Sequence, residues 1–264
     1  MPRLPSVFIS HGSPMHALEP GALGASWVAL AKTLPRPKAI LVASAHWEAE
    51  FPTLTGAAHP DTVHDFYGFP EPLYRLRYPA PGSPELAMRV RDLLNQLGDR
   101  AGIDGTRGFD HGAWSQLLHM YPEADIPVVQ ISVQTGLGAA HHIDLGRKLA
   151  PLRDEGVLVM GSGNLTHNLR EAFSAMRGGA PVSPLPYVRE FQQWVQVALE
   201  AGDAQALADY RQRAPNAVRA HPSDEHFLPL HVAFGAGGAE AARAERVYED
   251  VELAALAMDT WVFH

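Results

Sequence analysis

Three short apolar runs in the chain each lead into a histidine. The runs cover residues 6–9, 39–45 and 156–160, and the histidines that follow them are His11, His46 and His167. Runs that are apolar on both faces are typical of strands buried in a parallel sheet. Open α/β sheets bind ligands just outside the carboxyl ends of their strands. We therefore expect the three histidines to share one site at one edge of a sheet.

The remaining periodicity predicts helices between these strands and a few further strands. Helices are expected at 21–33, at 84–97, from the turn 107–114 to Met120, at 139–153, in two pieces across 184–212 broken near Gly202, and from about Asp224 to Phe234. Ser83 and Ser223 are the predicted N-caps of the second and the last of these helices. Further strands are expected at 127–133 and, one or two of them, within 246–263. The segment 161–164 (GSGN) is predicted to be a flexible turn.

Residues 51–84 show little periodicity and are rich in proline, glycine and aromatic residues. A loop of this length inside a compact domain is usually a lid or a binding loop. We find no linker and no internal repeat. The pattern predicts an α/β protein made of a single domain over residues 1–264.

Composition narrows the range of functions. The chain has 264 residues, 46% hydrophobic content and a formal net charge of −8, with no cluster of lysine or arginine, which argues against nucleic-acid and anionic-membrane partners. The absence of cysteine excludes disulfides, thiolate metal sites and a cysteine nucleophile. No apolar run approaches the ~20 residues of a membrane helix, and no signal pattern is seen. We expect a soluble, cytoplasmic protein.

The unusual feature of the composition is its 14 histidines. A lone histidine is more often structural than a ligand, and this interpretation is given to His16, His59, His119, His141, His142, His231 and His264. His11 and His46 differ, because each lies at a strand end among small residues. On adjacent strands, both could bind one metal ion.

Imidazole ligands without thiolates suit zinc, Fe(II), copper or nickel, and a catalytic metal has about three protein ligands and one open position. The candidates for the third ligand are His226, Glu225, His167 and His111. Glu225 would complete the two-histidine, one-carboxylate set of non-haem iron enzymes. These considerations leave Glu225 and His226 as open alternatives.

His167 and His111 are also candidates for general acid/base chemistry, since imidazole titrates near neutral pH. Asp110 either orients His111 or is only a turn residue. The glycines of 161–163 lack the spacing of a phosphate-binding loop. No serine lies in a G-x-S-x-G elbow, which disfavours a serine hydrolase.

Seven short motifs occur in order along nearly the whole chain. They are 10–15 (SHGSPM), 44–47 (SAHW), 63–66 (VHDF), 78–82 (YPAPG), 108–114 (GFDHGAW), 161–164 (GSGN) with His167, and 222–229 (PSDEHFLP). In these motifs the chain resembles the 4,5-DOPA extradiol dioxygenase family. That family belongs to the class III ring-cleaving dioxygenases of the protocatechuate 4,5-dioxygenase B-subunit type.

The resemblance implies a single α/β domain with a central, mostly parallel sheet flanked by helices. It also implies one divalent metal ion, Fe(II) for activity with Zn(II) as the alternative. The ligands would be His11, His46 and His226, the resemblance favouring His226 over Glu225. His167 would be the acid/base residue and a possible fourth ligand, and His111 would lie near the bound oxygen.

The implied reaction is the breakdown of an aromatic compound. A small catechol, such as DOPA, would be cleaved with O2 to a muconic semialdehyde-type product. His64, Asp65, Phe66 and Tyr74 are the residues we expect over the substrate ring. The competing hypotheses are a zinc-dependent hydrolase and a non-catalytic metal-binding protein on the same fold. In all cases we expect a monomer or a small homo-oligomer.

Overall fold

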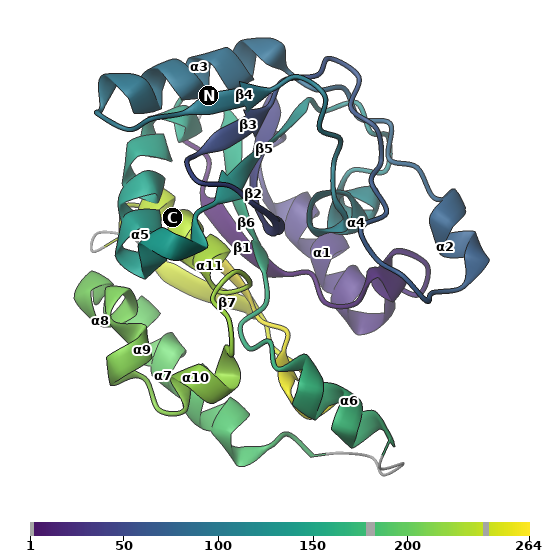
Figure 1. Cartoon of the computed structure of the whole chain (residues 1–264), viewed down its shortest axis with the longest axis vertical. Helices are drawn as coiled ribbons and strands as arrows, with labels where there is room; N and C mark the ends of the chain where they lie inside the picture. Colours follow the sequence, from purple (N-terminus) through teal and green to yellow (C-terminus); the bar gives the residue numbers. More distant parts are fainter. Residues whose placement is uncertain (1–2, 178–182, 240–242) are drawn as a thin grey trace.

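The computed structural model describes residues 3–177, 183–239 and 243–264. Its centre is an eight-stranded sheet with the strand order β4-β3-β5-β2-β6-β1-β10-β7 (Figure 1). The strands of this sheet are β1 (Ser6–Ser10), β2 (Ala39–Glu48), β3 (Thr53–Thr55), β4 (Gly102–Asp104), β5 (Val128–Val133), β6 (Val157–Gly163), β7 (Ala244–Tyr248) and β10 (Thr260–Phe263). β8 (Val251–Glu252) and β9 (Leu256–Ala257) form a separate antiparallel pair.

The middle of the sheet is parallel, as expected. β6 pairs in parallel with both β1 and β2, and β2 pairs in parallel with β5. The expectation that the strands carrying His11 and His46 are adjacent was wrong, because β6 lies between them. The two histidines still reach the same edge, since all three strands point the same way.

Eleven helices are found in the described part of the chain. They are α1 (Gly21–Thr33), α2 (Glu71–Arg75), α3 (Pro84–Gln96), α4 (His111–Met120), α5 (Gly138–Leu149), α6 (Leu169–Arg177), α7 (Pro186–Glu200), α8 (Ala204–Ala208), α9 (Tyr210–Arg213), α10 (Ala217–Ala220) and α11 (Leu228–Gly237). Short 3-10 turns lie at Pro14–Ala17, Thr135–Leu137 and Ala150–Arg153.

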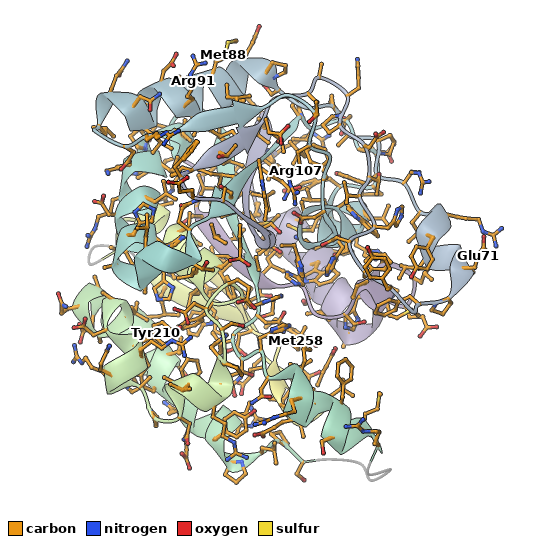
Figure 2. All side chains as sticks on the ribbon, viewed as in Figure 1. Glu71, Met88, Arg91, Arg107, Tyr210 and Met258 are labelled. Atoms are coloured by element: carbon orange, nitrogen blue, oxygen red, sulfur yellow. The ribbon has the colours of Figure 1, made fainter. Side chains whose placement is uncertain are left out.

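Helices cover both faces of the sheet (Figure 1). Successive residues of β2 pack against opposite layers. Val42 packs into a core cluster with Trp27 of α1 and Trp114 of α4. Leu41 points to the opposite face, into a cluster with residues of α3, α5 and α11. A third cluster joins the outer strand β10 to α7–α11, and the buried Tyr210, labelled in Figure 2, belongs to it. Burial on both faces explains why β2 is apolar throughout.

Local signals predicted the long helices well but failed at two places. The Ser83 hydroxyl accepts a hydrogen bond from the Leu86 amide and caps α3, as predicted. Ser223 caps nothing, because α11 begins only at Leu228 and the turn before it is held by amide bonds to the Asp224 carbonyl. The segment 161–163 is not a flexible turn but the buried end of β6.

The segment 51–84 is not without structure, since β3 and α2 lie within it. β4 and α6 were not predicted, and the segment 246–263 holds more strands than the one or two expected. Among the described residues, no helix combines the length and apolar character that crossing a membrane requires.

Candidate metal centre

Five histidines converge on one cavity at the carboxyl edge of the parallel strands. The cavity has a volume of about 660 Å³. The histidines that line it are His11, His46, His111, His167 and His226. They come from five separate segments: the end of β1, the end of β2, the start of α4, the loop after β6 and the turn before α11. The expectation of one shared site is therefore met in the geometry.

His11 is buried and is held from two sides. Its amide donates a hydrogen bond to the Gly163 carbonyl at 2.9 Å, which ties the end of β1 to the end of β6. Its Nδ1 lies 3.0 Å from the Ser162 hydroxyl. Its Nε2 lies 3.0 Å from Nε2 of His46. With Ser162 at Nδ1, the Nε2 atom of His11 faces the cavity and His46.

Asp65 connects two further histidines. Its Oδ1 accepts a hydrogen bond from the His111 amide at 2.9 Å and lies 3.0 Å from Nδ1 of the same residue. Its Oδ2 lies 3.5 Å from Nδ1 of His46. Burial raises the pKa of Asp65, but its hydrogen bonds with His111 and its electrostatic interactions with His111 and His46 outweigh this effect and hold that pKa at about 2. An ionised carboxylate thus faces the Nδ1 atoms of both rings.

Asp110 does not orient His111. It is buried, and its carboxylate accepts hydrogen bonds from the Ser44 hydroxyl at 2.7 Å and from the Gln130 amide at 2.8 Å. Arg107, labelled in Figure 2, lies 3.1 Å from the same carboxylate. Burial raises the pKa of Asp110 despite these donors. Its role is to brace the ends of β2 and β5 behind the site.

His226 reaches the site because β6 ends in glycines. The His226 carbonyl accepts a hydrogen bond from the Asn164 amide at 2.9 Å. A Cβ atom on Gly163 would lie only 2.1 Å from this carbonyl oxygen. Glu225 lies behind the ring, 3.0 Å from Nδ1 of His226. In this arrangement the Glu225 carboxylate orients the imidazole of His226.

His167 stacks on His226. The two ring centroids are 3.4 Å apart and the planes differ by 12°. The lone pairs of an imidazole lie in its ring plane, and two parallel planes do not meet at one ion. In this stacked arrangement the lone pairs of His167 and His226 do not point at the same position.

The donor set fits a single metal ion. The ring centroids of His11, His46 and His226 are separated by 4.9, 5.4 and 4.9 Å. A ring nitrogen bound at ~2.1 Å places its ring centre about 3 Å from a tetrahedral ion, so three such rings lie about 5 Å apart. The ligand atoms that lie within 4.8 Å of one another fall into two groups, and the proposed trio draws on both: His11, His46 and His111, and His167, Glu225 and His226.

Burial keeps the imidazoles of His11, His46, His167 and His226 neutral. Desolvation lowers the pKa of His11 and of His226 well below the usual value, with nearby histidines adding to the effect. Burial likewise lowers the pKa of His46 to about 3 and that of His167 to about 4. A neutral imidazole offers a lone pair to a metal ion or a proton.

The residues expected over the substrate ring fall into two groups. Phe66 lines the cavity, whereas His64 and Tyr74 do not. These two rings pack against Phe66, with centroids 5.7 and 5.3 Å from the Phe66 centroid. Asp65 lies behind the histidines. The sequence did not indicate the apolar wall, which is formed by Tyr67, Phe69, Leu169, Phe173, Met176 and Leu256. The amphipathic spacing of 169, 173 and 176 was the signal that could have found half of it.

The seven histidines interpreted as structural do not line this cavity. His16 lies 3.1 Å from Glu252, and His119 lies 2.9 Å from the His16 carbonyl. His142 and His231 are fully buried and contact backbone groups. Partners of this kind are what a structural histidine needs.

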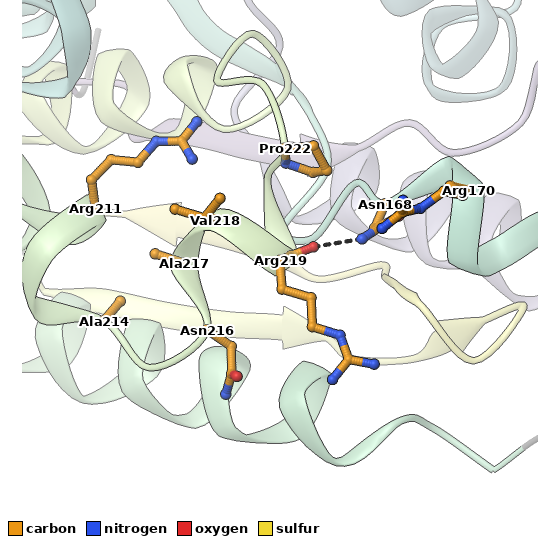
Figure 3. Close-up of a pocket in the computed structure, with 9 residues that line it drawn as sticks. All are labelled: Asn168, Arg170, Arg211, Ala214, Asn216, Ala217, Val218, Arg219 and Pro222. Atoms are coloured by element: carbon orange, nitrogen blue, oxygen red, sulfur yellow. Dashed lines mark hydrogen bonds between the residues drawn. The ribbon is translucent and has the colours of Figure 1, made fainter.

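A second cavity of about 660 Å³ lies beside α10 and has no comparable chemistry (Figure 3). Two of its three guanidinium groups are already paired, Arg211 with Asp224 and Arg219 with Glu171. Asn168 donates a hydrogen bond to the Arg219 carbonyl at 2.7 Å, drawn as a dashed line. The described residues that line it include no histidine and no carboxylate.

Fold and site together define an α/β protein whose candidate metal centre is built from histidines at the carboxyl edge of a parallel sheet. Residues 5–257 match the family described as the catalytic LigB subunit of aromatic ring-opening dioxygenase, and the chain belongs to this family. The sequence-based resemblance and fold class are thereby confirmed.

Curated relatives are similar over nearly their whole length. The 4,5-DOPA dioxygenase extradiol of Beta vulgaris is 46% identical over 247 residues, covering 91% of this chain and 89% of the relative. That of Escherichia coli K12 is 41% identical over 259 residues, covering 97% and 93%. A crystal structure of an uncharacterized E. coli K12 protein superposes with a TM-score of 0.83 at 37% identity, covering 99% of this chain and all of that one.

Proposed function

We propose that this protein is an extradiol dioxygenase that uses one divalent metal ion and O2 to open the ring of a catechol. The product would be of the muconic semialdehyde type, and residues 1–264 would form one catalytic domain. The observation that carries the proposal is the spacing of the His11, His46 and His226 rings, which suits one tetrahedral ion. Membership of the ring-opening family supports it independently.

His11, His46 and His226 would hold the ion, Fe(II) for activity and Zn(II) as the competing occupant. When bound, Fe(II) supplies a centre at which both catechol oxygens and O2 are held side by side. Ser162 and Glu225 each face the Nδ1 atom of a ligand ring, and such contacts fix the tautomer. Two of the three proposed ligand rings, those of His11 and His226, would thus be oriented before any ion binds.

His167 would move the proton. Its ring is neutral, because burial lowers its pKa to about 4, and it stacks beside the proposed ligand His226. A ring nitrogen of His167 can accept a catechol proton and return it later. Asp65 faces Nδ1 of His111, so the other ring nitrogen of His111 serves the cavity, where it would contact the oxygen substrate.

In the test, the protein is first loaded with Fe(II) under anaerobic conditions. Its consumption of O2 is then measured after air is admitted. With catechols we expect O2 uptake matched by a yellow ring-opened product. His167→Ala should retain metal and lose roughly 10²–10⁴-fold in turnover. His141→Ala is the matched control, because His141 lies outside the cavity, and it should behave as wild type.

Two outcomes would contradict the proposal. One is the absence of O2 uptake with every catechol tested, despite full iron occupancy. The other is turnover of an ester or amide that persists without O2, which would indicate a metal-dependent hydrolase.

A further inference from the structure

The cavity has one polar end and one apolar end. The five histidines form its floor, where the catechol oxygens would bind. Its walls and mouth are formed by Pro14, Met15, Phe66, Tyr67, Phe69, Leu169, Phe173, Met176, Leu253 and Leu256. A catechol with its oxygens toward the histidines therefore has its ring substituent against apolar side chains.

Helix α6 supplies much of the mouth. Leu169, Phe173 and Met176 recur at helical spacing and are 42, 47 and 56% exposed, while only Ala172 of this helix is buried. Eleven large hydrophobic side chains are exposed in the described part of the chain, and five of them line this cavity. Exposed apolar side chains that cluster at one place mark a binding surface. The apolar face of α6 is thus turned toward a ligand rather than toward a core.

No described residue of the cavity lining carries a lysine, arginine or carboxylate side chain. The residues outside the described ranges contain no lysine or arginine either. Arg170 of α6 lines the second cavity instead (Figure 3).

The polar lining residues other than histidine are Ser13, Tyr67 and Asn164, and none of them carries a charge. The Ser13 hydroxyl accepts from the Met15 amide. Asn164 accepts from the Gly12 amide and donates to the Met258 sulfur. An ammonium or carboxylate group buried here would lose its hydration without gaining an ionic partner.

We propose that the substrate of this site is a catechol with an uncharged apolar substituent, aryl or alkyl, rather than an amino-acid side chain. The statement that the substrate is a catechol rests on the proposed function. The substituent would lie along α6 and cover Phe173 and Met176. DOPA carries both an ammonium and a carboxylate at that position, and no described residue of the lining offers a lysine, arginine or carboxylate side chain to pair with either.

The test compares 4-phenylcatechol, catechol and L-DOPA by calorimetric titration of the Fe(II)-loaded protein without O2. Binding is read in the absence of turnover, so the result does not depend on ring cleavage. A phenyl group that leaves water on this surface should tighten binding roughly 10- to 100-fold relative to catechol. L-DOPA should bind no more tightly than catechol.

Variants locate the effect on α6. Phe173→Ala should reduce the ratio between the catechol and 4-phenylcatechol dissociation constants at least fivefold. Val197→Ala is the matched control, since Val197 is an exposed apolar residue of another helix and lies outside the cavity. Arg177 directly follows Met176 of the mouth and, unlike Arg170, does not line the second cavity. Arg177→Gln should leave the affinity for L-DOPA unchanged.

The inference is overturned if L-DOPA binds more tightly than 4-phenylcatechol, or if 4-phenylcatechol does not bind. A loss of L-DOPA affinity in Arg177→Gln would also overturn it, because a cation at the mouth would then be binding the carboxylate. Failure of the proposed function is a separate result: tight binding of 4-phenylcatechol with no O2 uptake on aeration.

Discussion

Ser162 controls the state of His11 from the neighbouring strand. The Ser162 hydroxyl lies 3.0 Å from Nδ1 of His11 and accepts a hydrogen bond from the Gln116 amide at 3.1 Å. Gln116 is itself fixed, since the same amide also bonds to the Gly112 carbonyl in α4. A metal bound at Nε2 requires the proton on Nδ1, and the Ser162 oxygen is positioned to accept it.

Ser162→Ala should therefore weaken metal binding by roughly 10- to 100-fold. The alanine removes the acceptor for the His11 proton without changing any proposed ligand. The measurement is competition with a chelator, performed for Zn(II) and Fe(II). Ser6→Ala serves as control, because Ser6 is an equally buried serine of β1 whose hydroxyl bonds to the Ala233 carbonyl, away from the site. Equal affinities in the two variants would show that Ser162 does not act on His11.

The sequence indicated the histidines of the candidate site better than the side chains that hold the histidine rings in place. His11, His46 and His167 were found because each follows an apolar run, which is a local signal. Ser162 and Asp65 bind these rings from other segments, and nothing within their own segments shows which ring they face. Asp110 illustrates the error this produces: its neighbour in sequence is His111, but its contacts are Ser44 and Gln130.

The end of β6 is shaped by the absence of side chains. Gly161 and Gly163 lie under the turn and helix that carry His226, and a Cβ atom on either would come within 2.1 Å of a backbone carbonyl oxygen. α11 can therefore lie directly on the sheet, with its preceding turn at the carboxyl edge. The sequence analysis took these glycines for flexibility, whereas their function is close approach.

Gly163→Ala should displace the His226 turn. We expect a loss of about 1–3 kcal/mol in the free energy of unfolding, together with a loss of metal affinity. Gly146→Ala is the matched control, since its Cβ would lie 2.2 Å from the Val232 carbonyl oxygen, at the α5–α11 contact. It should destabilise the protein by a similar amount and leave metal affinity unchanged in chelator competition. Unchanged affinity in Gly163→Ala would argue against His226 as a ligand.

Helices and strands whose start, end and apolar pattern can be read within their own residues were predicted closely. Elements that lack such local signals were missed. α3 has a serine cap, a proline in its first turn and an apolar stripe, all within the element. β3 and β4 have three residues each and exist because they pair with each other and, through Leu54, with Ile131 of β5. The apolar face of α6 lines the cavity and does not pack on the sheet. The sequence analysis looked for helices that pack on the sheet, and it therefore missed α6.

The protein as a whole carries several histidines that must be neutral to stay buried. Outside the candidate metal centre, burial lowers the pKa of His142 and His221 to about 3 and that of His231 to about 4. His142 shows the reason in its contacts: Nε2 accepts the Gln134 amide at 3.0 Å, and Nδ1 lies 2.7 Å from the Gly138 carbonyl. A second proton would remove the acceptor of the Gln134 amide.

Acid should therefore destabilise the fold before most carboxylates titrate. The folded-state pKa of His142 is depressed, so its contribution to stability is complete above its usual value of 6.5 and falls as the pH decreases toward 3. At pH 5 this one group should lower the free energy of unfolding by about 2 kcal/mol relative to neutral pH.

His142→Gln keeps an acceptor for the Gln134 amide but cannot be protonated. Urea denaturation of the chelator-treated protein from pH 7.5 to 5 should show a shallower loss of stability in this variant. Chelation is needed because release of metal by protons would add its own destabilisation. His264→Gln is the control, since His264 is exposed and pairs with Glu245 at the surface. Parallel pH profiles for wild type and His142→Gln would mean that His142 does not resist protonation in the folded state.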